Sequence, residues 1–390
     1  MSPFYQVNGI GDVYLPASFR AIAPDDAPFK LFTNGDLGQL DRIFTYLRRG
    51  GVAILSGEWE QVTAVMRYID RKRNELIRPS QQSKGKRNAG SKVRHTPEAD
   101  GGDPMFRLMC WADQTGIVQV NPSPHLPYLF ELIGENTGAN EVHPFLIPVV
   151  VLQKIQNALG ETYPIDALGM SLLALTNVLP PRSQETIQLF QRGLRSVKAH
   201  LPAEATVLDM GCGCGALTLL AVQELGEPGV TIHAADLLPE AVATTRLNLQ
   251  RFTDVRTVTS EIKVVLAGDL FQPVAGVGFD LIVFNAPWVV SRARNRAELA
   301  IHDENQATLR RFFHDAPSYL KAEGRILIGY ADASGSKAIS NLEAMVEAAA
   351  FAIVKRFKER VATHRSKGKW ENITVYELMC HRAASEAHCK

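Results

Sequence analysis

The stretch that decides the fold reads Val207-Leu208-Asp209-Met210-Gly211-Cys212-Gly213-Cys214-Gly215-Ala216. An apolar strand ends in an acid, three alternating glycines follow, and a helix then begins. Glycines suit this place because the chain must turn through φ values that other residues resist, and because a ligand can then approach the backbone. The first turn of the helix offers free N–H groups to an anion or another acceptor. The stretch predicts a ligand-binding strand-loop-helix unit, although it also fits the dinucleotide pattern, and a glycine-rich turn without a ligand is a further alternative.

Outward from this stretch, from Ser183 onward, apolar strands alternate with helices. The predicted strands are Thr206–Met210, Thr231–Ala235, Ile262–Leu266, Asp280–Phe284, Arg325–Gly329, Phe351–Phe357 and Ile373–Met379. The predicted helices are Ala216–Leu225, Pro239–Phe252, Asn305–Leu320 and Ser336–Ala350. Such alternation indicates an α/β fold with a Rossmann-like, mostly parallel sheet covered on both faces. No helix separates the last two strands, so one of them is expected to be antiparallel.

Two more acids follow strand ends, where ligands bind in such sheets. Asp236, followed by Leu237, comes 25 residues after Gly211 and is placed to accept hydrogen bonds from two ribose hydroxyls. Asp269, followed by Leu270, comes after the third strand and is placed to meet an adenine amino group. Each acid alone is as well explained as a helix cap. Three acids after three consecutive strands favour a nucleoside site.

The fourth strand delivers an unusual set of groups to its end, Asn285-Ala286-Pro287-Trp288. An N–H nucleophile is well held by an Asn amide oxygen and a backbone carbonyl, while an aromatic ring covers its planar face. The structural alternative is an Asn cap and a core Trp. We therefore interpret this turn as the candidate reacting centre.

Together these residues resemble the class I S-adenosylmethionine-dependent methyltransferases. The similarity covers residues ~165–380 and is carried by Asp209, Gly211, Gly213, Gly215, Asp236, Asp269 and Asn285-Ala286-Pro287-Trp288. The most similar branch has an Asn-Pro-Pro-aromatic motif and includes glutamine N5-methyltransferases of release factors and exocyclic-amine RNA methyltransferases. Val178-Leu179-Pro180-Pro181-Arg182 is also similar to the Pro-Arg element of that branch.

The resemblance implies S-adenosylmethionine as the cofactor and a seven-stranded sheet whose last strand is antiparallel. It implies that the methionine moiety lies over Asp209 and the glycine loop, the ribose on Asp236, and the adenine near Asp269 and Leu270. The expected cofactor-binding residues are Asp209, Gly211, Gly213, Gly215, Asp236, Leu237, Asp269, Leu270 and Asn285. The expected catalytic residues are Asn285, Pro287 and Trp288.

The chain departs from the family motif at Ala286, which replaces the first Pro and is expected to loosen the turn that aims the acceptor. The leading hypothesis is methyl transfer to a nitrogen of a protein amide, a base or a small metabolite. An alternative reaction attacks another carbon on sulfur, giving aminocarboxypropyl transfer or internal cyclisation to a four-membered amino acid, with methylthioadenosine released. Two further hypotheses are a nicotinamide oxidoreductase and a non-catalytic binding protein that keeps the cofactor fold.

His302, Cys212 and Cys214 lie close to these motifs in the sequence. His302 is either a proton acceptor on a loop that closes over the site or a solvated surface residue. Cys212 and Cys214 indicate small side chains in the glycine loop rather than a metal site, because no other ligands of suitable spacing accompany them.

Residues 1–160 predict a smaller amino-terminal domain of the α/β or α+β class, an accessory or acceptor domain, ahead of the catalytic domain at 161–390. Its amphipathic helices are Leu37 to Arg49 and Trp59 to Arg73, around a strand from Gly51 to Leu55. Phe145 to Leu159 and Ile165 to Val178 are helical or buried apolar segments.

Residues 71–104 form a basic stretch that predicts a flexible loop, with nine Lys or Arg between Arg71 and Arg94. A nucleic-acid contact is the less favoured interpretation of this stretch, because no aromatic residues are interleaved to stack on bases.

The composition narrows the class of protein. The net charge of +1 gives no global field to attract a polyanion, so a nucleic-acid contact needs a local patch. The five cysteines form no CxxC pair, which favours a reducing compartment. No long apolar segment is present, so we expect a cytoplasmic protein without a membrane contact. The acceptor substrate is not identified by any motif.

Overall fold

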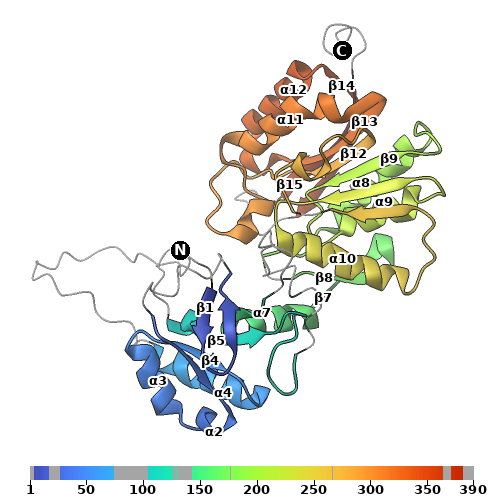
Figure 1. The fold of residues 1–390 in the computed structure, drawn as a ribbon. Coiled ribbons are helices and arrows are strands. Elements are labelled where there is room, and N and C mark those ends of the chain that lie inside the picture. The colour runs from blue at the N-terminus through green and yellow to red at the C-terminus, as the bar shows by residue number, and fades with distance from the viewer. Residues whose placement is uncertain are drawn as a thin grey trace, which may run out of the picture. The chain divides into compact units, whose positions relative to one another are not determined.

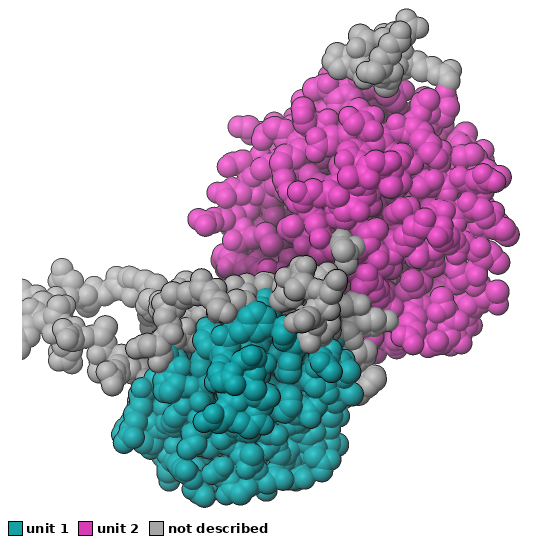
Figure 2. Space-filling model, in the orientation of Figure 1, with its two compact units in different colours: residues 1–157 teal, residues 158–390 magenta. Residues whose placement is uncertain are grey.

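The computed structural model describes residues 4–16, 27–73, 104–124, 126, 129, 143–175, 177–265, 267–362 and 370–380. The chain divides into two compact units, residues 1–157 and residues 158–390, which Figure 2 shows in different colours. Most of the basic stretch at 71–104 lies outside the described residues.

The carboxy-terminal unit is built on a seven-stranded sheet, labelled in Figure 1. Its strands are β9 (Thr206–Met210), β10 (Thr231–Ala235), β11 (Glu261–Val264), β12 (Phe279–Asn285), β13 (Leu320–Ala331), β14 (Phe351–Ala362) and β15 (Trp370–Cys380). The strand order is β11-β10-β9-β12-β13-β15-β14, and β15 runs antiparallel to both of its neighbours. The predicted α/β fold with a mostly parallel seven-stranded sheet is confirmed.

Helices cover both faces of this sheet (Figure 1). They are α8 (Gln184–Lys198), α9 (Ala216–Leu225), α10 (Pro239–Thr253), α11 (Ala307–Tyr319) and α12 (Ser336–Ala348), with short 3₁₀ turns η3 (Gln272–Val274), η4 (Arg296–Ala300), η5 (Glu304–Gln306) and η6 (Asp332–Ser334). Apolar residues of α11 and α12 pack with alternate residues of β9, β12 and β13 in one buried cluster. Helix α8 contacts the opposite face together with α9.

The strand order of the sheet changes direction at β9. From β9 it adds β10 and β11 on one side, and then crosses to add β12 on the other side. The connections that leave the carboxyl ends of β9 and β12 therefore diverge. In a parallel sheet this is the place where a crevice forms for a ligand.

A short hairpin precedes the large sheet. Strands β7 (Thr162–Ile165) and β8 (Met170–Leu173) pair antiparallel around the 3₁₀ turn η2 (Asp166–Leu168), where a helical or buried apolar segment was expected. Gly169 closes the turn with a φ of +59°. The buried amide of Asn248 on α10 bonds both backbone groups of Leu173 and also donates to the carbonyl of Cys214. The hairpin thereby supports the glycine loop.

The amino-terminal unit contains a mixed six-stranded sheet in the order β1-β2-β6-β5-β4-β3. Its strands are β1 (Phe4–Val7), β2 (Gly11–Tyr14), β3 (Phe29–Phe32), β4 (Val52–Leu55), β5 (Leu108–Ala112) and β6 (Phe145–Pro148). Its helices are α2 (Asn34–Leu37), α3 (Leu40–Arg48), η1 (Pro104–Arg107), α4 (Trp59–Arg71) and α7 (Val149–Gly160). Most of the helix expected from Leu37 to Arg49 is α3, whereas Leu37 ends α2, because the backbone leaves helical geometry at Gln39 between the two. Across the described parts of both units, no helix has the length and apolar character needed to span a bilayer.

Candidate functional site

The glycine loop forms a tight turn between β9 and α9. Gly211, Gly213 and Gly215 all have positive φ, at +70°, +55° and +82°. A side chain at Gly215 would lie 3.2 Å from Thr245 on α10, so this position needs a residue without Cβ for two reasons. The N–H groups of Gly211 and Cys212 donate to the carbonyl of Ala235 on β10, at 2.8 and 3.0 Å. The loop is therefore held against the neighbouring strand.

Asp209 is the buried acid of the site, with 1% of its surface exposed. Its Oδ2 accepts a hydrogen bond from the hydroxyl of Thr218 on α9, 2.5 Å away, while its Oδ1 has no partner among the described residues. Burial, with a smaller contribution from the charge of Asp236, raises the pKa of Asp209 to about 7, although hydrogen bonding to Thr218 lowers it. A cationic ligand beside Oδ1 would relieve this cost, because it favours the ionised carboxylate.

Asp236 follows β10 and shapes the loop as well as facing the crevice. Its Oδ2 accepts from the N–H of Gly213 and its Oδ1 from the N–H of Leu238, both at 2.9 Å. Each carboxylate oxygen keeps a second lone pair, so a hydroxyl can still be accepted. Burial raises the pKa of Asp236, and these backbone donors oppose that shift. The neighbouring Leu237 side chain is 50% exposed.

Asp269 and Leu270 lie on the loop after β11, which is joined to Asp236 by a 2.9 Å bond from the N–H of Gly268 to the Asp236 carbonyl. Both Asp269 carboxylate oxygens bond the guanidinium of Arg311, at 2.5 and 3.0 Å. An adenine amino group would have to share these oxygens with Arg311. A hollow of about 380 Å³ lies here, and its lining includes Asp269, Leu270, Arg311 and the stacked rings of Phe271 and Tyr319.

Asn285 ends β12 on the same face of the sheet as Asp209. Val283 pairs with Asp209 across the two strands, and residues two apart along a strand share a face. The amide Oδ1 of Asn285 is buried and, within the described chain, has no hydrogen-bond partner. A Cβ built on Gly329 of β13 would lie only 2.9 Å from this oxygen and 2.7 Å from the Phe190 ring. Gly329 thus leaves the room in which the Asn285 amide stands.

The turn after Asn285 is fixed by hydrogen bonds. The N–H of Ala286 donates to the carbonyl of Gly329 at 3.2 Å, which a proline at this position has no hydrogen to do. The Ser334 hydroxyl donates to the Trp288 carbonyl at 3.0 Å and accepts from the N–H of Val290 at 2.8 Å. Ala286 is also fully buried, and the expected loosening of the turn stays a prediction.

The loop after Trp288 returns to the same edge of the sheet. Backbone bonds join Val289 to Ile301 and Asp303, and the Ser291 hydroxyl lies 2.8 Å from Nδ1 of His302. The loop thus begins and ends beside the candidate reacting centre. This position is compatible with both interpretations of His302, a proton acceptor at the site or a solvated surface residue.

The structure brings most of the expected residues together at one edge of the sheet, where parallel sheets form their ligand crevice. The glycine loop, Asp209, Asp236 and Asn285 gather at the carboxyl ends of β9, β10 and β12, whereas Asp269 and Leu270 lie further along, after β11. Sequence reasoning missed Thr218, Gly329 and Ser334, which support Asp209, Asn285 and Trp288. A hydroxyl inside a helix and a glycine inside a strand carry no signal of their own.

Cys212 and Cys214 are both buried, and burial raises the pKa of Cys212 well above its usual value and that of Cys214 to about 12. Both therefore stay thiols at neutral pH. In the described portions of the chain, no group of three or more His, Cys, Asp and Glu side chains is arranged to hold a metal ion.

Residues 191–358 match the family described as the methyltransferase small domain. The match runs from α8 through most of β14, and so includes the glycine loop and the turn after Asn285. Together with the strand order, it supports a class I S-adenosylmethionine-dependent methyltransferase and S-adenosylmethionine as its cofactor.

Several curated methyltransferases are similar in sequence to part of this chain. The release factor glutamine methyltransferase of Enterococcus faecalis is 30% identical over 169 residues, which are 40% of this chain and 56% of that protein. The ribosomal RNA small subunit methyltransferase C of Alcanivorax borkumensis is 28% identical, over 40% of this chain and 45% of its own length. This chain thus spans about half the length of the curated relatives that it matches.

Among solved structures, TYW2 of M. jannaschii in complex with AdoMet overlaps 56% of this chain and 85% of its own, at 12% identity and a TM-score of 0.36. So loose an overlap has no bearing on function.

Proposed function

We propose that the protein is an S-adenosylmethionine-dependent methyltransferase that transfers a methyl group to a planar nitrogen acceptor. The observation that carries the proposal is that the buried Oδ1 of Asn285 and the buried Oδ1 of Asp209 lie on the same sheet face, each without a hydrogen-bond partner among the residues that the structure describes. A buried acceptor without a donor costs free energy, so such a group is expected to gain its partner from a ligand.

The residues of the crevice fit the cofactor group by group. Asp209 offers an unpartnered carboxylate oxygen to the cationic methionine end, and the glycine loop with the first turn of α9 offers N–H groups to a carboxylate. The free lone pairs of Asp236 suit ribose hydroxyls, with Leu237 beside them, and the hollow by Leu270 suits the adenine ring. When bound, the cofactor supplies an electrophilic methyl group on sulfur.

Asn285, Pro287 and Trp288 are assigned to binding and orienting the acceptor. Asn285 Oδ1 would accept an N–H of the acceptor and stabilise the positive charge that grows on nitrogen, and a carbonyl of Ala286 or Pro287 would accept the other N–H. As the N–C bond forms and the S–C bond breaks, S-adenosylhomocysteine would leave and the acceptor nitrogen would release one proton to solvent. The bonds from Ser334 and Gly329 fix this turn before the acceptor arrives, so little reorganisation is needed. Trp288 covers the planar face of the acceptor.

The acceptor is proposed to be an amide or an exocyclic amine. Relatives named for release factor glutamine and for ribosomal protein uL3 glutamine support an amide, and the one named for ribosomal RNA is compatible with a base. An amide and an aromatic amine share a planar nitrogen that carries N–H groups. The relatives give no support to the non-methylating use of the sulfonium.

The test identifies the nucleoside product. Purified protein is incubated with methyl-labelled S-adenosylmethionine, alone and with separate protein and RNA fractions of a cell extract, and the products are resolved by mass. We expect S-adenosylhomocysteine and a labelled acceptor that depend on an added fraction, and we expect both to form far more slowly with the Asn285→Ala variant. Methylthioadenosine formed from the cofactor alone would contradict the proposal.

A further inference from the structure

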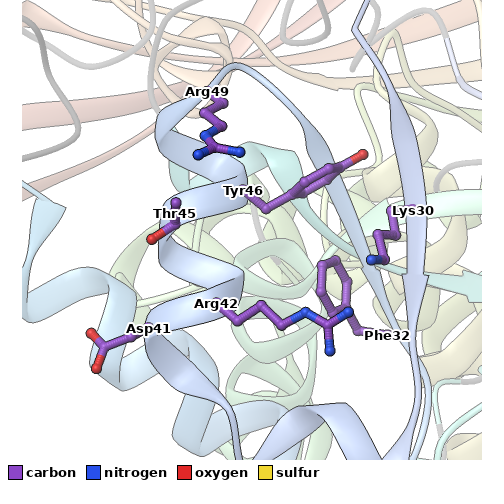
Figure 3. A pocket seen from close by; sticks show the side chains of 7 residues that line it. All are labelled: Lys30, Phe32, Asp41, Arg42, Thr45, Tyr46 and Arg49. Atoms are coloured by element: carbon purple, nitrogen blue, oxygen red, sulfur yellow. The ribbon is translucent and has the colours of Figure 1, made fainter.

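A second concave surface lies in the amino-terminal unit, far from the motifs in sequence. It is a hollow of about 440 Å³ between β3 and α3, drawn in Figure 3. Lys30 and Phe32 are two apart on β3 and so share a face, while Arg42, Tyr46 and Arg49 recur at the i, i+4 and i+7 positions of α3 and its last turn. The hollow thus collects three cations around two rings.

The charge of this hollow is not balanced by its own acids. In the described part of the unit, Lys30 and Arg49 have no carboxylate partner, and Arg42 shares its charge with Asp36 at 3.0 Å. Asp41 also borders the hollow, but it bonds Tyr68 and Lys72 and points away from Lys30 in Figure 3. Arg42 reaches across toward Phe32 and Lys30 in the same view.

The floor of the hollow is apolar and fixed. The Phe32 ring is 1% exposed and meets the Tyr46 ring edge-on at 5.5 Å, and the Tyr46 hydroxyl donates to the carbonyl of Pro28 at 2.7 Å. The Lys30 ammonium stands 5.2 Å above the Phe32 ring centre. Because the floor excludes water from one side, cations above it attract an anion more strongly than they would in open solvent.

We propose that this hollow binds a phosphate group, either on a free anion or in the backbone of a nucleic acid. Arginine presents a planar set of donors that matches the oxygens of phosphate, and lysine adds a compact charge beside it. The volume lies in the range of small-ligand sites, and its open form admits a chain that continues beyond the bound group. The Phe32 ring is too buried to stack on a base, and the partly exposed Tyr46 ring is tied to Pro28 by its hydroxyl, so the recognition is of charge rather than of sequence.

The experiment measures binding of two probes to the full chain without S-adenosylmethionine. One is a labelled single-stranded RNA of about twelve nucleotides, followed by fluorescence anisotropy, and the other is inorganic pyrophosphate, followed by calorimetry. Lys30→Ala and Arg49→Ala are each expected to lower affinity for the bound probe about tenfold, the scale of one charge-assisted hydrogen bond, and Lys30→Arg is expected to retain it. Each substitution should also reduce the slope of log affinity against log salt concentration for RNA by about 1, because one phosphate contact is lost.

The matched control is Arg48→Ala, an exposed arginine next to Arg49 that does not line the hollow. Displacement of the RNA by pyrophosphate would identify a free anion as a ligand, and RNA binding that pyrophosphate leaves intact would identify the backbone. The proposal fails if Lys30→Ala and Arg49→Ala bind both probes like the wild type, or if neither probe binds. It fails equally if Arg48→Ala is as damaging, or if only neutralising Lys84, Lys86, Arg87, Lys92 and Arg94 abolishes binding.

This inference goes beyond the proposed methyl transfer and does not rest on it. The probes report on the amino-terminal unit, and cofactor affinity of the same variants is measured separately. A variant that loses phosphate binding but keeps cofactor affinity separates the two sites.

Discussion

The crevice of the carboxy-terminal unit and the hollow of the amino-terminal unit are both polar, but they are constructed differently. In the crevice, Asp209 is buried, and Asp236 accepts one backbone N–H from Gly213 of the glycine loop and one from Leu238 at the start of α10. In the hollow, the half-buried Lys30 stands over the Phe32 ring, and the exposed Arg49 comes from the end of α3. Buried groups with fixed partners select a particular ligand geometry, whereas exposed cations select mainly for charge.

The two sites also differ in how much they lower the stability of the fold. Holding Asp209 ionised in the interior opposes folding, since burial raises its pKa to about 7. Surface cations carry little such cost. We therefore expect substitutions in the crevice to have sharper effects than substitutions in the hollow.

The largest effect is expected from Asn285→Ala. Turnover should fall roughly 10²–10³-fold, because one hydrogen bond to the transition state is lost, while cofactor affinity changes far less. The fold should survive, since Oδ1 of Asn285 has no protein partner to leave unpaired in the described chain. Steady-state kinetics and calorimetry measure the two quantities, with Asn295→Ala in the neighbouring loop as the control. Full activity of Asn285→Ala would reduce the turn to a structural element.

Next in size is Asp236→Ala, which should lower cofactor affinity at least tenfold. The change removes the proposed ribose contacts and also the bonds to the N–H groups of Gly213 and Leu238. Calorimetry with Asp254→Ala, an exposed acid at the end of α10, controls for the loss of one charge. Cofactor affinity of Lys30→Ala should equal that of the wild type. If Asp236→Ala binds the cofactor normally, the crevice is not the nucleoside site.

A smaller effect is expected from pH. The pKa of Asp209 in the free protein is about 7, and a bound cation lowers it, so binding below pH 7 has to release a proton. Cofactor affinity should therefore rise by up to about tenfold per pH unit as pH approaches 7 from below, and level off above it. Calorimetry in two buffers of different ionisation enthalpy measures the released proton. Asp209→Asn should bind more weakly and without this pH dependence, and a wild-type affinity that falls as pH rises toward 7 would refute the role of Asp209.

The smallest effect is expected from replacing residues 74–103 with a short Gly-Ser linker. The composition of this stretch is too polar to build a core, so melting temperature and cofactor affinity should stay nearly unchanged. Thermal melts followed by circular dichroism, with calorimetry on the same preparation, make the measurement. A large loss of either quantity would mean that the stretch contributes to the folded units.

The strands next to the site were predictable because each is a continuous buried run. β9, β10 and α9 have the bounds expected from the sequence, since an apolar stretch between glycines or polar turns has one stable placement in a parallel sheet. β11 lies at the sheet edge and is half exposed, so its pattern is weaker, and it ends at Val264 rather than at residue 266.

Helix α11 shows where local pattern fails. It was expected to begin at Asn305, but Asn305 and Gln306 have φ values of +57° and +55° and the helix begins at Ala307. The buried amide of Gln306 bonds the Tyr330 hydroxyl at 2.9 Å and the Ala338 carbonyl at 3.0 Å. These partners lie more than twenty residues away, so tertiary contacts decide the conformation.

The sequence by itself determined the succession of strands and helices along the carboxy-terminal unit. It also determined the glycine loop and which acids and which Asn stand at the strand ends. Only the tertiary structure decided that Asp269 is bonded to Arg311, that Gly329 leaves room for the Asn285 amide, and that Lys30 joins Arg42 and Arg49 in one hollow. Burial of one face of a strand or helix requires apolar residues at regular spacing, and this spacing is visible in the sequence. Contacts between side chains from distant elements depend on packing, which leaves no period in the sequence.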